Sequence, residues 1–499
     1  MTSLTEKAGL LTLSNVCRRA ATILSGIIVV RWLSQQDLGT FRQVNLIFST
    51  SCIILLLGIP ASLYYFLPRA QEHEKRGIIT QTLITLGLIG LVSSIILFFL
   101  ASQISAAFHN PDISVLIRRY SPYLVFYLPG AAYFAVMMCM DRVAAAAIGG
   151  ICITLPQIVA TIIPLMLHYS LLTIFTTMLI TGIIVSMLAS WLCLRVTPKG
   201  PFYPPKGFGA KQFKFSLPLG MSQVVSLTGK EIDKFFISSF FSVKDFAMYS
   251  VGAVELPITN LLNPAIRNVL LPKFTELLHK REVEELLVIW RESRRKLSLI
   301  TFPIIILFFC IAPEFITFLY SNKYIQSASI FQIYLLIPLV ENFESSIILH
   351  ASGKPNKIFF ASLVNVGCNI IISYVLIQKI TYFGPCIATV IATIISFVVV
   401  IRWVCREIKV SFSELFPFSE YLRILIISFI SSIPLFIFRR LSLFPSRFVF
   451  LILSSAAFFL ILFPCYYKFV LRQEDLYFIA QQLSRIPPLN KLIKSKEEK

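Results

Sequence analysis

Long apolar runs separated by short polar stretches dominate the sequence. A helix needs about 20 apolar residues to cross a bilayer, and the runs reach this length repeatedly. They lie at about residues 10–32, 42–66, 78–100, 118–140, 143–167, 171–194, 213–241, 246–271, 297–319, 328–351, 357–378, 383–404, 419–438 and 447–469. The pattern therefore predicts an all-α polytopic membrane protein with about 14 transmembrane helices.

Two long polar stretches organise the predicted helices. Residues 195–212 are rich in Pro and Gly and predict a cytoplasmic hinge. Residues 273–296 carry many charges and predict a solvated cytoplasmic helix against lipid headgroups. The expected domains are a six-helix bundle at 1–194, a cytoplasmic linker at 195–212, a second six-helix bundle at 213–405, two additional transmembrane helices at 406–470 and a basic cytoplasmic tail at 471–499.

A weak internal repeat supports this division. The end of the first span, Leu33-Ser34-Gln35-Gln36-Asp37-Leu38-Gly39-Thr40-Phe41, is similar to the end of the seventh, Phe241-Ser242-Val243-Lys244-Asp245-Phe246-Ala247-Met248-Tyr249. Leu67-Pro68-Arg69 and Leu271-Pro272-Lys273 end the second and eighth spans in the same way. Because six spans, an even number, separate the copies, the two bundles are expected to be parallel repeats. The alternative is chance similarity of short polar connectors.

Composition and charge support a membrane location. Only 14% of the 499 residues are charged, against roughly 25% in soluble domains, so a soluble enzyme is excluded. The net charge of +20 could indicate nucleic-acid binding in a soluble protein. Here, with a cytoplasmic N-terminus, cytoplasmic segments hold about three times as many Lys and Arg as outside loops. We therefore expect both termini to be cytoplasmic and expect no nucleic-acid partner.

Polar and cationic residues within the predicted spans mark a candidate binding site. An ionisable group at bilayer depth is costly and by default functional. No acid lies next to the arginines in the sequence, so an anionic ligand is the better interpretation, because Arg suits phosphate recognition. The expected substrate-binding residues are Asn15, Arg18 and Arg19 in the first span, Lys230 and Lys234 in the seventh, and Asn260, Asn263 and Arg267 in the eighth.

Four acids within the spans are candidates for proton or sodium coupling. They are Asp233, Glu255, Glu341 and Glu344. Glu341 and Glu344 are one helical turn apart, and two carboxylates that close would not both ionise readily in a low dielectric. For these residues, and for the cations, structural ion pairs between packed helices are the alternative explanation.

Several enzyme and cofactor classes are excluded by missing motifs. Gly229-Lys230 and Gly353-Lys354 lack the remainder of a phosphate-binding loop, so no ATP site is expected. There is no Gly-x-Ser-x-Gly motif and no large outside loop for paired catalytic residues. The Cys and His residues lack metal-site spacing. We expect a transporter rather than an enzyme, with no catalytic residue, metal or cofactor.

Several stretches give the chain a resemblance to a known family. They are Leu38-Gly39-Thr40-Phe41, Glu231 to Ser238, Ala247-Met248-Tyr249, Leu271-Pro272, Ala312 to Phe315 with Phe318-Leu319-Tyr320 and Tyr324, and Asn365 and Asn369 leading into Gly384 to Thr389. In their order and spacing, the chain resembles the polysaccharide transporters, or Wzx-type lipid-linked oligosaccharide flippases, of the multidrug/oligosaccharidyl-lipid/polysaccharide (MOP) exporter superfamily. Ala247 stands where that family usually has Gly, and Pro385 stands where it usually has a small residue.

The resemblance implies an architecture and a function. It implies two six-helix bundles around a central cavity that opens to either side in turn, with two extra C-terminal helices. It also implies translocation of an undecaprenyl pyrophosphate-linked oligosaccharide across the bacterial inner membrane for O-antigen, capsule or exopolysaccharide assembly. The expected partners are this lipid-linked oligosaccharide, membrane lipids, and polysaccharide polymerase or export proteins.

Other functions remain open at this stage. A lipid II flippase also needs cations for a pyrophosphate. A drug or cation exporter of the same superfamily would have a cavity dominated by acids and aromatic residues, whereas the expected cavity is net basic. A membrane glycosyltransferase or polymerase would need the outside loop that this sequence lacks.

Overall fold

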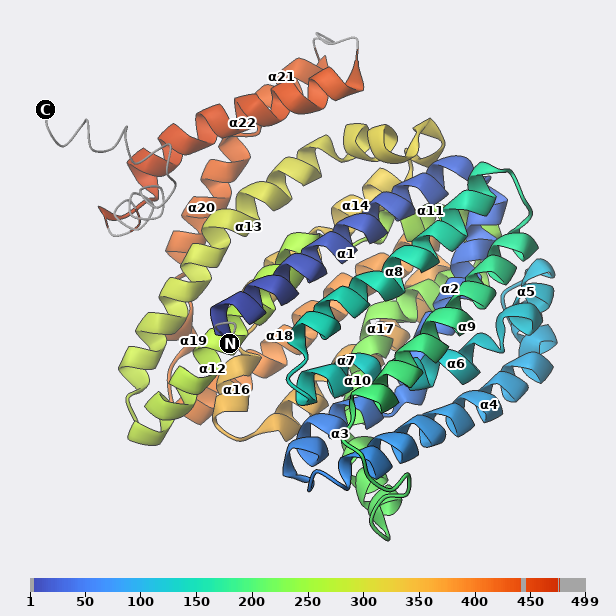
Figure 1. The fold of residues 1–499 in the computed structure, drawn as a ribbon. Helices are drawn as coiled ribbons and strands as arrows, with labels where there is room; N and C mark the ends of the chain where they lie inside the picture. Colours follow the sequence, from blue (N-terminus) through green and yellow to red (C-terminus); the bar gives the residue numbers. More distant parts are fainter. Residues whose placement is uncertain (1–3, 441–445, 474, 476–499) are drawn as a thin grey trace, which may run out of the picture. The chain divides into compact units, whose positions relative to one another are not determined.

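The computed structural model describes residues 4–440, 446–473 and 475, and these form helices with no strand (Figure 1). The side chains of residues 4, 5, 8 and 257–261 lie outside the description, as does almost all of the predicted tail at 471–499. The chain divides into two compact units, each assembled from segments that are distant in sequence.

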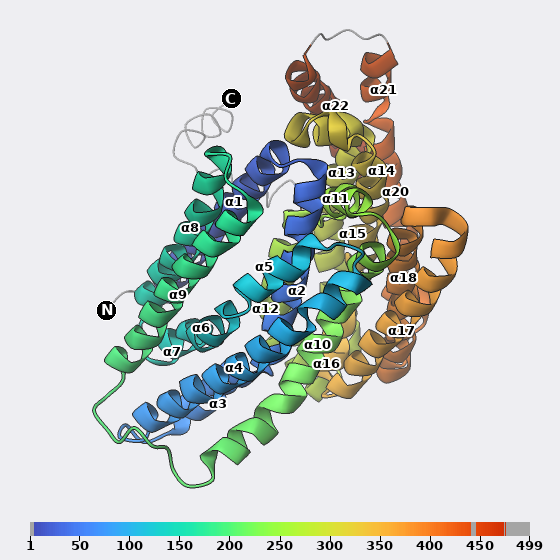
Figure 2. The ribbon, with the colours of Figure 1, turned by 90° about the vertical axis from the view of Figure 1, so that its right-hand side faces the viewer.

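The first unit contains residues up to 254, 319–333 and 359–396. Neighbouring helices pack in the order α1, α8 and α9, and α4 packs on α6 (Figure 2). Its helices are α1 (Leu4–Trp32), α2 (Gln35–Leu56), α3 (Ile59–Phe66), α4 (Lys75–Ala107), α5 (Asp112–Tyr120), α6 (Tyr123–Gly130), α7 (Tyr133–Cys139), α8 (Val143–Met166), α9 (Leu171–Val196), α10 (Phe208–Phe240), α11 (Val243–Gly252), most of α14 (Ser327–Tyr334) and α17 (Pro355–Ile380), and the first half of α18 (Gly384–Ile408).

The second unit contains residues 255–318, 334–358 and those from 397 onward. Within it, α12 packs on α16, and α22 packs on both α20 and α21. Its helices are α12 (Pro257–Lys280), α13 (Val283–Tyr320), α15 (Leu336–Glu341), α16 (Ser346–Ala351), the end of α18, α19 (Phe412–Leu415), α20 (Phe418–Ile430), α21 (Ile433–Arg440) and α22 (Arg447–Phe469). The predicted division into two six-helix bundles stays a prediction.

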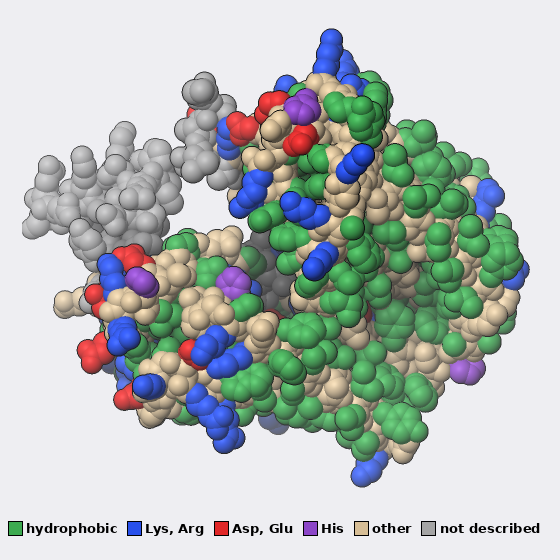
Figure 3. Space-filling model, turned by 90° about the horizontal axis from the view of Figure 1, so that it is seen from below, with side chains coloured by type: hydrophobic (Ala, Val, Ile, Leu, Met, Phe, Trp, Pro, Cys, Tyr) green, Lys and Arg blue, Asp and Glu red, His purple; other side chains and the backbone are tan. Residues whose placement is uncertain are grey.

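Each predicted span corresponds to a helix or a broken helix. Nine segments of the described chain are long and apolar enough to cross a membrane, or ten if the bent pair Asp112–Tyr120 and Tyr123–Cys139 counts as one span. The count is below fourteen for physical reasons: α10 carries charges, the eighth predicted span is broken between α11 and α12, and the tenth is broken into short helices. In addition, the eleventh and twelfth predicted spans fall in one apolar segment, Pro355–Ile408, which counts once. Hydrophobic side chains cover much of the molecular surface in Figure 3. The protein is a multi-pass membrane protein.

Buried hydrogen bonds join α10 to the N-terminal helices. Gln43 on α2 is fully buried and donates to Ser238 of α10 at 2.9 Å. Asn110 donates to Gln43 at 2.6 Å and so satisfies its carbonyl oxygen. Near the start of α10, Gln212 donates to Ser62 at 3.1 Å and to Thr82 at 3.0 Å. Because buried polar groups are costly when unpaired, these bonds fix the packing of α10 within the first unit.

The two copies of the sequence repeat begin their helices in the same way. Ser34 caps α2 by accepting from the backbone N–H of Asp37, and Ser242 caps α11 by accepting from that of Asp245. The two helices also pack on one another, and Gly39 permits this because an added Cβ would lie 2.2 Å from the Val243 carbonyl oxygen. A Ser followed by an Asp three residues later favours a helix N-cap, so the repeated motif marks the start of a helix in both copies.

The charged stretch 273–296 differs from the prediction of a solvated helix. The chain turns at residues 281–282, and residues from Val283 continue into α13 as one helix that ends at Tyr320. Arg294 and Arg295 are each only 3% exposed. The prediction was wrong for these two residues because packing buries them against Asn342 and Asp475, which lie far away in the sequence.

Candidate functional site

Arg18 and Arg19 lie near the middle of α1, where it packs on α8. Ser14 anchors this contact by donating to the Ala147 carbonyl oxygen at 2.7 Å. One turn later, the Arg18 guanidinium rests on Gly150: a Cβ added there would lie 2.7 Å from Arg18 Nη1. The absence of a side chain at Gly150 therefore makes the space that the guanidinium occupies.

Neither arginine is neutralised by an ion pair among the described residues. The Arg18 Nε is buried and has no hydrogen-bond partner there. Arg19 and Asn15 are exposed. An unpaired guanidinium in a spanning helix carries a desolvation cost that an anion would offset, and its forked donors match phosphate oxygens. Anion binding by Arg18 and Arg19 stays a prediction.

The charged group on α10 partly neutralises itself. Lys234 donates to Glu231 at 2.7 Å. Asp233 is fully buried, and its carboxylate accepts from the Tyr249 hydroxyl of α11 at 2.5 Å and from the Lys234 backbone at 2.8 Å. Lys230 is exposed on the same helix. Asp233 is therefore buried inside the first unit, whereas Lys230 is the more accessible cation of this group.

Polar side chains from α17 and α18 meet α10 one turn from Asp233. Asn369 is buried and donates to the Gly229 carbonyl oxygen at 3.5 Å and to Thr389 at 3.2 Å. Ser373 donates to the Asn369 side-chain oxygen at 2.9 Å. In the sequence, Asn369 stands out only as part of the resemblance to the polysaccharide transporter family. Its clustering with Thr389 and Ser373 depends on helix packing that spacing along the chain does not reveal.

In the second unit, Arg267 is paired. Its Nη2 donates to both carboxylate oxygens of Glu344, at 2.9 and 2.8 Å. The inference of a free cation from its sequence neighbours missed a partner 77 residues away. Phosphate binding by Arg267 stays a prediction, and a phosphate would have to compete with Glu344.

The remaining predicted site residues also belong to the second unit. Asn263 accepts from Arg294 at 3.4 Å. Asn260 lies on α12, but its side chain is outside the described residues. Glu341 closes α15 and Glu344 lies in the break before α16, so the expected placement of both on one continuous helix was wrong. Glu255 is half-buried before α12.

Arg294 is a buried cation that sequence analysis missed. It donates to the Asn342 carbonyl oxygen at 3.2 Å, and its guanidinium lies 4.3 Å from the centre of the Trp290 ring. Asn342 in turn donates to Ser298 at 2.6 Å and accepts from Thr301 at 3.1 Å. The i, i+4 spacing of Trp290 and Arg294, typical of a helical cation–π pair, was the available signal.

The comparisons with known proteins agree with this helical architecture. A family model described as "Polysaccharide biosynthesis protein" matches residues 28–329. No curated protein matches the chain significantly in sequence.

Solved structures of transporters share the fold. A structure described as lipid II flippase MurJ in an inward closed conformation is 17% identical, with a TM-score of 0.75 over 94% of this chain and 99% of that one. An inward-facing multidrug resistance MATE family transporter of the MOP superfamily is 14% identical, with a TM-score of 0.67 over 79% and 94%. A MOP superfamily transporter from Pyrococcus furiosus is 13% identical, with a TM-score of 0.55 over 81% and 96%. The chain therefore has the MOP transporter fold and belongs to the polysaccharide biosynthesis protein family.

Proposed function

We propose that this protein is a flippase that moves an undecaprenyl pyrophosphate-linked oligosaccharide across the bacterial inner membrane for surface polysaccharide assembly. Membership of the polysaccharide biosynthesis protein family supports the substrate class, and the transporter fold supports translocation rather than catalysis. Both termini would be cytoplasmic, as the distribution of Lys and Arg predicts. Polysaccharide polymerase or export proteins would receive the translocated product.

The observation that carries the proposal is the unpaired arginine pair on α1. A sugar headgroup with its pyrophosphate cannot enter hydrocarbon without a polar route and a compensating charge. Arg18 and Arg19 have no ion-pair partner in the described chain, and Gly150 leaves the space that the Arg18 guanidinium occupies. We assign them to the pyrophosphate, with Arg267, Lys230 and Lys234 as further cations and Asn15, Asn260 and Asn263 as polar contacts for the substrate.

Translocation in proteoliposomes tests this assignment. The probe is an undecaprenyl pyrophosphate-linked oligosaccharide, whose appearance in the opposite leaflet is followed by a glycosidase added outside. Arg18→Gln and Arg19→Gln should each reduce the translocation rate strongly. The matched control is Arg69→Gln, which removes a cation that lies over the Tyr65 ring and donates to its carbonyl oxygen at 2.9 Å. Equal rates for all variants would overturn the assignment.

A lipid II flippase is the second candidate, favoured by the extensive structural match to MurJ. Lipid II carries the same pyrophosphate chemistry, so the arginines do not discriminate between the two substrates. Transport measurements with the same vesicles loaded with lipid II distinguish the two substrates. Faster movement of lipid II than of the undecaprenyl pyrophosphate-linked oligosaccharide would support this candidate. Drug export, which the MATE-like fold also accommodates, would leave both lipids in their original leaflet.

We further propose that Asp233 couples translocation to a proton or sodium gradient. Its buried carboxylate and the Tyr249 hydroxyl supply oxygen ligands that a hard cation prefers. The polar cluster of Asn369, Thr389 and Ser373 contacts α10 one turn away, at the Gly229 carbonyl oxygen. Glu255, Glu341 and Glu344 are the other coupling candidates. Asp233→Asn should abolish the dependence of transport on an imposed gradient, whereas Glu231→Gln should retain it. Wild-type transport that ignores both pH and sodium gradients would contradict coupling.

A further inference from the structure

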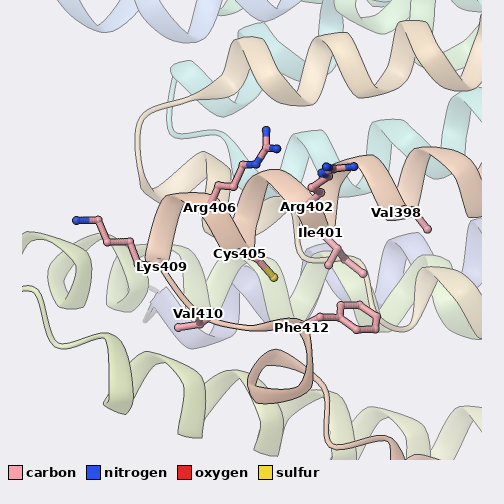
Figure 4. Close-up of a pocket in the computed structure, with 8 residues that line it drawn as sticks. All are labelled: Val398, Ile401, Arg402, Cys405, Arg406, Lys409, Val410 and Phe412. Carbon is pink, nitrogen blue, oxygen red and sulfur yellow. The ribbon is translucent and has the colours of Figure 1, made fainter.

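A second group of cations, none of them assigned to the substrate, lies at the C-terminal end of α18. A cavity of about 730 Å³ opens there between the helix and the segment that follows it (Figure 4). This volume is within the range of roughly 300–1,000 Å³ that is typical of ligand sites. The cavity therefore has room for a headgroup-sized molecule.

Three cations line this cavity from one face of the helix. Arg402, Arg406 and Lys409 are spaced four and three residues apart, so they share a face of α18. All three are exposed, and none forms an ion pair among the residues that the structure describes. Figure 4 shows Arg402 and Arg406 projecting side by side. The face they form is therefore positively charged without an internal counter-ion.

The acid nearest in sequence does not neutralise this face. Glu407 forms ion pairs with Lys354 at 2.6 Å and Lys357 at 2.9 Å. These two bonds hold its carboxylate toward the start of α17. The positive charge around Arg406 thus persists although an acid is its direct neighbour.

The rest of the cavity is apolar. Ile401 and Cys405 point toward Phe412, away from the two arginine side chains (Figure 4). Val398, one turn before Arg402, is 55% exposed, and Phe412 is 47% exposed. In a membrane protein, apolar surface open to the outside faces lipid. The cavity therefore joins a cationic end to an apolar wall.

We propose that this cavity binds an anionic membrane phospholipid. The phosphate would accept hydrogen bonds from Arg402, Arg406 and Lys409, and the acyl chains would extend along Val398 and Phe412. The predicted topology places this end of α18 at the cytoplasmic surface, where anionic lipids give the leaflet its negative potential. A free phosphate would fit the cations but would leave the apolar wall without an occupant.

The bound lipid would also connect two parts of the second unit. Phe412 begins α19, the short helix between α18 and α20, whereas the cations belong to α18 itself. A phospholipid in contact with both would hold the end of α18 against the connection to α20. Anionic lipid should therefore stabilise the protein as well as bind to it.

Native mass spectrometry of the full-length protein with phosphatidylglycerol or phosphatidylcholine tests the proposal. Phosphatidylglycerol should bind more tightly, and Arg402→Gln, Arg406→Gln and Lys409→Gln should each weaken it roughly fivefold. The matched control replaces Lys206, Lys211 and Lys214 by Gln, which removes the same charge from exposed positions outside the cavity. Thermal unfolding with each lipid measures the accompanying stabilisation and shows that the variants are folded.

The outcomes separate the possible occupants. Loss of phosphatidylglycerol binding when Arg402, Arg406 and Lys409 are all replaced by Gln, with binding retained in the control variant, supports the proposal. Equal loss of binding in the control variant overturns the proposal and indicates general charge attraction. Equal affinity for phosphatidylcholine also overturns it and indicates non-specific lipid contact. Stoichiometric displacement of phosphatidylglycerol by an undecaprenyl pyrophosphate-linked oligosaccharide or by inorganic phosphate also overturns it. None of these results depends on whether the protein is a flippase.

Discussion

Arg267 and Glu344 form an ion pair between α12 and the break before α16, in which one guanidinium nitrogen donates to both carboxylate oxygens. Ser346 also donates to this carboxylate. The pair is half-exposed, with 50% of the arginine side chain and 38% of the glutamate side chain accessible. Glu344 therefore occupies donors of Arg267 that a phosphate would otherwise use, while leaving the site accessible.

Glu344→Gln should strengthen the binding of inorganic pyrophosphate to the purified protein. The substitution removes the competing charge, and it should change the free energy of unfolding by less than about 1 kcal/mol because exposed pairs contribute little. Isothermal titration calorimetry measures the affinity. The control is Glu314→Gln, which breaks the pair of Glu314 with Arg439, 2.6 Å apart, and neither residue is a predicted substrate contact. Unchanged affinity after Glu344→Gln would remove Arg267 from the phosphate site.

Gly150→Ala should reduce substrate translocation several-fold. The new methyl group would lie 2.7 Å from Arg18 Nη1 and would displace the guanidinium rather than the backbone. Gly26→Ala, on α1 itself, is the control, because nothing lies within 4 Å of its added Cβ. The proteoliposome assay compares the two variants at equal protein content. A normal rate for Gly150→Ala would show that the position of the Arg18 side chain is unimportant.

Tyr249→Phe should destabilise the first unit. It removes a donor from the buried Asp233 carboxylate, and losing a partner of a buried acceptor costs roughly 1–3 kcal/mol. Tyr374→Phe, at an exposed hydroxyl on α17, should change stability by less than about 0.5 kcal/mol. Thermal unfolding in detergent measures both. Equal melting temperatures would mean that the Asp233–Tyr249 bond contributes no stability.

The second unit should lose stability in acid through Asp475. Burial by itself raises the pKa of this carboxyl, but hydrogen bonds from Arg295 and the Arg472 backbone outweigh it and lower the pKa below its usual value of 3.8. A carboxyl with a lowered pKa in the folded state stabilises the fold above its unfolded pKa, and this contribution is lost as the pH falls through the folded value. Acidification below about pH 4 should therefore loosen the contact of residue 475 with α13.

Asp475→Asn should remove this acid sensitivity and lower stability at neutral pH. Breaking a buried ion pair costs roughly 3–5 kcal/mol, and we expect the lower end because Glu292 also contacts Arg295, at 3.4 Å. Melting temperatures at neutral and acidic pH, for the wild type and the variant, give the comparison. A variant that melts at the wild-type temperature at neutral pH would show that the contact is dispensable.

The helices were predictable because their signal is local. Runs of apolar residues determine where α4, α9 and α22 lie, and the Ser34-Asp37 and Ser242-Asp245 spacings mark two N-caps. Breaks within spans were harder to predict. Pro-containing apolar stretches such as 118–140 look continuous in hydropathy but bend between α5 and α6.

Ion-pair partners could not be predicted, because packing brings together residues that are distant in sequence. Arg267 pairs with Glu344, 77 residues away, and Arg294 donates to the carbonyl oxygen of Asn342, 48 residues away. Arg18 differs: its sequence neighbours offered no acid, and the structure provides none among the described residues. The sequence thus identified the unpaired cation but not the paired ones.

The most direct test of the proposed function is mass spectrometry of polyprenol-linked intermediates, with their membrane sidedness, after depletion of this protein in its native host. Complementation should succeed with the wild type and fail with Arg18→Gln. The proposal predicts that a complete lipid-linked oligosaccharide accumulates on the cytoplasmic face. An unchanged lipid-linked pool, or accumulation of truncated oligosaccharides, would contradict it.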